Sequence, residues 1–102
     1  MGSPSSTDVH RARADVDAIA VRTPVIGSRI LSDRLGSHVV LKAENLQRTG
    51  AFKIRGAAAK VARLGHEARI GLVAASAGNH AQALALAARA RGMTAEVYMP
   101  AN

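Results

Sequence analysis

The chain contains no cysteine or tryptophan, and only one phenylalanine and one tyrosine among its 102 residues. The absence of cysteine excludes disulfide bonds and thiol chemistry, and it is compatible with a reducing cytoplasm. No apolar run approaches the roughly 20 residues that span a bilayer, and no apolar leader follows a charged N-terminus. We therefore expect a soluble, cytoplasmic protein without a membrane partner.

Acidic residues are also scarce, since seven Asp and Glu stand against 14 Lys and Arg, for a net charge of +7. A charge of this size occurs in nucleic-acid-binding proteins. The arginines are scattered singly among alanines and acids, however, and no aromatic residues alternate with them for base stacking. We expect a solvated basic surface and no nucleic-acid partner, with a non-catalytic basic binding module as an alternative. The four histidines lack metal-ligand spacing, so no metal site is expected.

The apolar pattern predicts an α/β fold. Hydrophobic residues make up 48% of the chain and are mostly small aliphatics, which suits helices packed tightly on a parallel sheet. Residues 1–6 are predicted to be a flexible lead, and 7–102 to form one domain. Its expected architecture is an open parallel sheet in three layers, with the segment 70–75 buried on both faces. The strands are predicted near 38–43, 70–75 and 95–99, and the main helices near 53–64 and 79–91.

The N-terminal third is predicted to hold two further helices. Ser6 or Thr7 can cap the first, which the segment 22–24 (RTP) ends because the residue before proline avoids the helical region. Residues 25–26 then form a short extended piece. Ser28 can cap a second, brief helix that ends at Gly36.

A lysine stands at the start of the helix predicted over 53–64. It lies in the segment 50–56 (GAFKIRG), where a glycine-flanked loop leads into the helix. A lysine amine can form a Schiff base with an aldehyde cofactor and then act as an acid or base. The positive end of the helix dipole disfavours a protonated amine at this place. The alternative is a surface lysine on an alanine-rich helix, which is the favoured interpretation of Lys53 when its sequence context is left aside.

A second segment, 75–82 (ASAGNHAQ), opens the helix predicted over 79–91 directly after an apolar strand. The N–H groups of a helix start form a site for a carboxylate or phosphate. Asn79 can donate a side-chain hydrogen bond to a phenolate-like oxygen. In the alternative, Asn79 or Ser76 only caps the helix and Gly78 relieves a tight turn.

Together and in this order, the two segments resemble the fold-type II pyridoxal-phosphate enzymes. The branch that they resemble most closely contains the threonine/serine dehydratases and the serine racemases. The similarity runs from about Arg22 to Pro100 and includes the segments 22–25 (RTPV) and 41–47 (LKAENLQ). It implies part of the small domain of a tryptophan synthase β-like fold, with pyridoxal 5′-phosphate as the cofactor.

The resemblance also implies roles for individual residues. Lys53 would be the Schiff-base lysine, Phe52 would lie against the cofactor, and Asn79 would bond its 3′-oxygen. The substrate carboxylate would be held by a loop formed by Ser76, Ala77, Gly78, Asn79 and His80.

The implied reaction is a β-elimination in amino-acid metabolism, with isoleucine biosynthesis as its expected setting. Lys53 would remove the Cα proton of the substrate, hydroxide would leave, and hydrolysis would give a 2-oxo acid and ammonia. The oxo acid is 2-oxobutanoate from threonine and pyruvate from serine. Serine racemase and hydroxyaspartate dehydratase are alternatives within the family. Similar racemases carry serine where Ala77 stands, and alanine cannot move a proton, so a dehydratase is favoured over a racemase.

The chain departs from the family pattern in three respects. Ala51 stands where relatives usually carry serine, and Arg48 where proline is frequent. Relatives bind the phosphate and ring nitrogen of the cofactor with residues beyond the stretch present here. We therefore expect an N-terminal fragment that is inactive alone and whose parent is a homo-oligomer. A truncated, catalytically silent remnant is the alternative.

Overall fold

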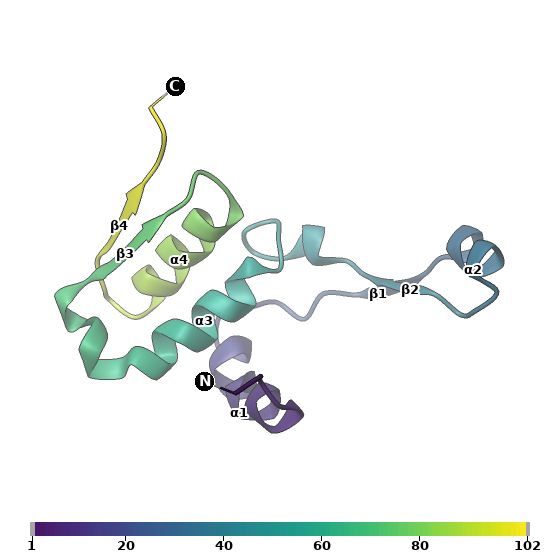
Figure 1. The fold of residues 1–102 in the computed structure, drawn as a ribbon, viewed down its shortest axis with the longest axis horizontal. Helices are drawn as coiled ribbons and strands as arrows, with labels where there is room; N and C mark the ends of the chain where they lie inside the picture. Colours follow the sequence, from purple (N-terminus) through teal and green to yellow (C-terminus); the bar gives the residue numbers. More distant parts are fainter. Residues whose placement is uncertain (1, 102) are drawn as a thin grey trace.

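The computed structural model describes residues 2–101, apart from the side chain of Ala68. Met1 and Asn102, the outer limits of the predicted lead and domain, lie outside the described residues. The molecule is elongated, measuring 51 × 40 × 26 Å along its principal axes. Figure 1 shows a body of helices and strands from which a thin arm extends.

The body contains three α-helices and two short parallel strands. Helix α1 (Ser6–Asp17) packs against α3 (Lys53–Leu64), which in turn packs against α4 (Asn79–Ala90). Helix α4 lies on the sheet formed by β3 (Leu72–Ala75) and β4 (Ala95–Tyr98). The two strands pair in parallel, with Leu72 opposite Ala95 and Ala75 opposite Tyr98. Strand–helix–strand connectivity through α4 is the unit that the sequence predicted here.

The core lies between α3 and α4 and is built largely from alanine. Ile54 and Val61 are its largest fully buried side chains. Small side chains let the two helices approach closely, and every methyl group between them is removed from water. The remaining core residues are Ile19, Ala57, Ala58, Leu72, Ala83, Leu84, Ala87 and Ala88.

The arm is an antiparallel hairpin with a helix at its tip. Strand β1 (Val25–Gly27) pairs with β2 (Val40–Lys42), with Val25 opposite Lys42. Between them lies α2 (Arg29–Leu35), capped by the Ser28 side chain and ended by Gly36 at φ 62°, as its sequence predicted. After β2, a 3₁₀ turn, η1 (Glu44–Leu46), leads back to the body.

The strand predicted near 38–43 does not join the parallel sheet, which corrects the predicted three-stranded arrangement. It pairs antiparallel with the segment 25–27, and bonds from Ser28 N to Val39 O (3.0 Å) and Ala43 N to Pro24 O (2.9 Å) extend the ladder. The physical reason is the local partner: a hairpin between segments near in sequence costs less loop-closure entropy than a distant pairing. The α/β class and the parallel pairing of β3 with β4 are confirmed.

Three further details differ from the sequence prediction. Ser5, and neither Ser6 nor Thr7, caps α1, because its side chain and that of Asp8 exchange bonds with each other's backbone N–H groups in a capping box. The 3₁₀ segment η2 (Gly65–Ile70) precedes β3, so the strand begins later than predicted, and Ile70 is 96% exposed.

The third difference concerns burial of the sheet. Leu72 faces the core, whereas Val73 on the opposite face of β3 is 70% exposed. Helices therefore cover one face of the sheet within residues 2–101, and the expected covering of both faces is not formed by them. No helix in this described stretch is long and apolar enough to span a membrane.

The packing makes a testable prediction at Val61. We expect Val61→Ala to lower the free energy of unfolding by about 2 kcal/mol, because it removes two methyl groups from a fully buried site and leaves a cavity. Val9→Ala is the matched control, since Val9 is a helical valine with 68% of its surface exposed. Its effect should stay within about 0.5 kcal/mol. Urea unfolding measures both, and equal losses would contradict the assignment of the core.

Candidate functional site

Lys53 is the first residue of α3, and its side chain is exposed. Its Nζ atom lies 5.6 Å from the centroid of the Phe52 ring, which is itself 61% exposed. Phe52 is the N-cap residue and supplies no side-chain hydrogen bond to the helix, and the first turn contains no acidic residue. The positive end of this helix is thus left open beside an accessible primary amine.

The segment 76–80 forms the turn between β3 and α4. Ser76 is anchored at the sheet, where its N–H donates to Tyr98 O at 3.0 Å. Its hydroxyl accepts a bond from Gly78 N at 3.3 Å. Gly78 is the N-cap of α4 and no side chain caps this helix, so the alternative in which Asn79 or Ser76 only caps the helix is wrong. The N–H groups of its first turn remain available to an anion.

The two helix starts lie at the same end of the body. Figure 1 shows α3 and α4 running in the same direction, with their first turns at the end of the sheet where β3 finishes. Helix N-termini and the loops that follow parallel strands gather ligand sites at such an end. The structure thus brings together the helix starts that carry Lys53 and Asn79. That their side chains face each other stays a prediction.

A partly buried polar cluster near Lys53 in the sequence was not predicted. Glu44 accepts two bonds from Arg55, from Nε to Oε2 at 2.9 Å and from Nη2 to Oε1 at 2.7 Å. The Thr23 hydroxyl also donates to Glu44 Oε1, and Thr23 is only 4% exposed. These residues lie in the segments that carry the resemblance, so the signal was present. Pairing between polar side chains of different segments leaves no periodic pattern in a sequence, so spacing alone does not predict this cluster.

The environment of Glu44 favours its charged form. The hydrogen bonds from Arg55 are the main cause that lowers the pKa of Glu44 from 4.5 to about 2, against an opposing contribution from burial. Thr23 and Gln47 add to the lowering. The carboxylate therefore stays ionised throughout the physiological range and keeps the guanidinium paired.

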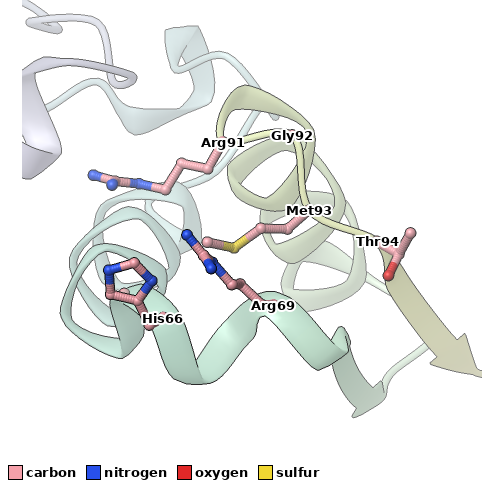
Figure 2. A pocket seen from close by; sticks show the side chains of 7 residues that line it. His66, Arg69, Arg91, Gly92, Met93 and Thr94 are labelled. Carbon is pink, nitrogen blue, oxygen red and sulfur yellow. The ribbon is translucent and has the colours of Figure 1, made fainter.

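A cavity lies away from this site. It encloses about 650 Å³ beside the C-terminal ends of α3 and α4. Figure 2 shows the side chains of His66, Arg69 and Arg91 around it. Basic side chains at these positions complement the negative ends of the helix dipoles, and Arg91 Nη2 donates to Asp15 Oδ1 at 3.3 Å. Its place at the opposite end of both helices separates it from Lys53.

The described part of the chain contains no cluster of three or more His, Asp or Glu side chains that could hold a metal ion. Among the buried side-chain nitrogen and oxygen atoms of residues 2–101, the Thr49 hydroxyl lacks a hydrogen-bond partner. Thr49 belongs to the loop that leads into α3. Buried hydroxyl groups normally have a hydrogen-bond partner.

Comparison with known sequences identifies the class of protein. The family described as "Pyridoxal-phosphate dependent enzyme" matches residues 16–102. The chain belongs to this family, whose cofactor is pyridoxal phosphate.

The individual relatives that match the chain include ammonia-lyases and a serine racemase. An L-threonine ammonia-lyase of Thermotoga maritima is 49% identical over 94 residues, 91% of this chain and 23% of the relative. An L-threo-3-hydroxyaspartate ammonia-lyase of Saccharomyces cerevisiae is 46% identical over 98 residues, 95% of this chain and 30% of the relative. Maize serine racemase matches in structure with a TM-score of 0.85 at 37% identity, over 97% of this chain and 31% of its own. The chain thus spans about a third or less of the proteins it matches.

The chemical groups at the two helix starts are suited to binding pyridoxal phosphate. An accessible amine at the start of α3 suits covalent attachment of an aldehyde, and the uncapped start of α4 offers N–H donors to an anionic group. The roles of Phe52, Lys53, Ser76, Ala77, Gly78, Asn79 and His80 remain predictions from the resemblance.

The lowered pKa of Glu44 predicts a pH dependence. A carboxyl group whose pKa is lower in the folded state stabilises the fold above its unfolded pKa and loses this effect as the pH falls through the folded value. We expect the free energy of unfolding to fall by up to about 3 kcal/mol between pH 4.5 and pH 2. These limits are the ordinary pKa of the Glu44 carboxyl group and its pKa in the folded chain, about 2.

Glu44→Gln should flatten this part of the profile, because glutamine does not titrate. Urea unfolding across that pH range provides the measurement. A variant whose profile falls as steeply as that of the unchanged chain would show that other carboxyl groups cause the acid sensitivity.

Proposed function

We propose that this chain is the N-terminal portion of a pyridoxal-phosphate-dependent dehydratase that converts L-threonine to 2-oxobutanoate and ammonia. The observation that carries the proposal is the pairing of two features at one end of the body. An exposed lysine amine begins α3, and an uncapped, anion-accepting turn begins the neighbouring helix α4. Membership of the family supplies the cofactor that such an amine would bind.

The chain's own residues divide the work between them. The Lys53 amine would attach the cofactor covalently and afterwards take the Cα proton of the substrate. The N–H groups at the start of α4, within the segment 76–80, would bind the substrate carboxylate. The Asn79 amide would donate to the 3′-oxygen of the cofactor, and the exposed Phe52 ring would lie against it.

When bound, pyridoxal phosphate supplies an electron-accepting ring that stabilises negative charge at the substrate Cα. Removal of the Cα proton and departure of the β-hydroxyl group eliminate one water from threonine. Hydrolysis of the resulting enamine consumes one water and releases ammonia, so the atoms balance as threonine to 2-oxobutanoate plus ammonia.

The substrate assignment depends on the relatives and on one residue. Ammonia-lyases for threonine and for hydroxyaspartate are similar to the chain at 49% and 46% identity, so both substrates belong in the assay. Racemisation requires a group that returns a proton to Cα on the face opposite Lys53. Ala77 favours elimination over racemisation, because its methyl group cannot donate a proton.

The first prediction here concerns the full-length protein that carries this chain. Lys53→Ala should abolish borohydride-stable attachment of pyridoxal phosphate and the release of 2-oxobutanoate from threonine. Lys60→Ala is the matched control, because Lys60 is an exposed lysine on the same helix, about two turns further along. Peptide mapping after reduction identifies the modified lysine. Attachment that survives in Lys53→Ala would disprove the assignment.

The second prediction concerns the chain of 102 residues alone. It should neither bind pyridoxal phosphate tightly nor release ammonia from L-threonine, L-serine or L-threo-3-hydroxyaspartate. The cofactor phosphate carries up to two negative charges and needs several donors to replace water. The turn at 76–80 offers such a group of donors, and the proposal assigns it to the substrate. Lys53-dependent formation of a 2-oxo acid by this chain would contradict the division of roles.

A further inference from the structure

The first turn of α3 is held by an ion pair and not by a cap. Its N-cap, Phe52, makes no side-chain hydrogen bond to the helix. Arg55, on the same turn as Lys53, instead makes the two-point bond to Glu44 at 2.9 and 2.7 Å. A two-point bond fixes the plane of the guanidinium as well as its distance, so it restrains the turn that carries the lysine.

Glu44 is itself fixed to two other segments. The buried Thr23 hydroxyl donates to its Oε1 atom, and Lys42 Nζ lies 3.9 Å from the same oxygen. Lys42 Nζ also donates to Thr23 O at 3.1 Å. The Glu44 side chain is 17% exposed and that of Arg55 29%, so water screens their pairing less than that of a surface pair.

Gln47 anchors the start of the loop that connects η1 with α3. Its amide exchanges two bonds with the Val21 backbone, each at 2.8 Å, and its Oε1 also accepts from Arg48 N at 3.0 Å. Arg55 Nη2 reaches Val21 O at 3.4 Å. Gly50, at φ 68°, then turns the chain and donates to Gln47 O at 2.8 Å. The loop before Lys53 is therefore held at both of its ends.

We propose that Glu44 and Arg55 are positioning residues that hold the first turn of α3 so that the Lys53 amine is presented in one place. This inference rests on the proposed function of Lys53. It assigns the pair more than general stability, because α3 is also anchored by packing, through Ile54 in its first turn and through Ala57, Ala58 and Val61 beyond it. Loss of the pair should free the Lys53 side chain and the loop before it while the helix remains packed on α4.

The test begins with the chain itself, in which the three lysines carry ¹³C-dimethyl labels. Methylation keeps the positive charge. The proximity of Lys53 Nζ to the Phe52 ring makes its signal sensitive to the position of the amine. We follow the chemical shift of the labelled methyl groups of each lysine, called its signal below. In Glu44→Ala and Glu44→Gln we expect the Lys53 signal to move towards that of Lys60, while the Lys60 signal stays in place. Arg55→Gln removes the charged two-point bond without adding a labelled lysine, and it should move the Lys53 signal as well.

Asp15→Asn is the matched control. Asp15 forms a partly exposed ion pair with Arg91, away from Lys53, so its loss should leave the Lys53 signal unchanged. A Lys53 signal that stays in place in all three variants would overturn the proposal. Equal movement of the Lys53 and Lys60 signals would also overturn it, because it would show that the pair supports the whole helix.

The second measurement uses the full-length protein and borohydride trapping of pyridoxal phosphate. We expect the label ratio of Lys53 to Lys60 to fall about fivefold or more in Glu44→Ala, the effect of roughly 1 kcal/mol. An unchanged ratio would contradict a positioning role. If the unchanged protein carries no label at Lys53, the proposed function itself fails. The NMR signals need no cofactor, so they still decide whether the pair places the amine.

Discussion

The close packing of α3 against α4 is the contact on which the rest of the structure depends. Alanines on both helices are almost completely buried: Ala57 at 7%, Ala58 at 0%, Ala83 at 0%, Ala87 at 0% and Ala88 at 1% exposed. Small side chains allow a short distance between the helix axes. Since the helices run in the same direction, this contact also brings their N-terminal ends together, and with them the segments that carry Lys53 and Asn79.

The arm is organised differently from the body. Its hairpin is short, and most of its apolar side chains are exposed within residues 2–101. The exposed side chains include Val25 at 59%, Ile26 at 53%, Ile30 at 70% and Leu35 at 67%. The polar cluster of Thr23, Glu44 and Arg55 lies where the arm meets the body, and it joins the arm to the helix that carries the lysine.

Local sequence signals predicted most element positions because those elements depend on neighbouring residues. The helix at 53–64 was predicted with its observed bounds, and α2 with its Ser28 cap and Gly36 end. The segments with Lys53 and Asn79 were also recognised from their local context. The pairing of 40–42 was predicted wrongly, because an apolar run looks the same whether its partner is parallel or antiparallel. The exposed face of β3 was missed for a related reason, since burial depends on elements elsewhere in the chain.

The sequence by itself determined the α/β class, the family and the identity of the candidate lysine, because these depend on residue types at fixed spacing. The tertiary structure decided that Glu44 meets Arg55 and Thr23, which lie 11 and 21 residues from it along the chain. It also decided that α4 begins without a side-chain cap and that both helix starts share one end. Those features arise from side-chain geometry and helix packing, which bring together distant segments that no local pattern connects.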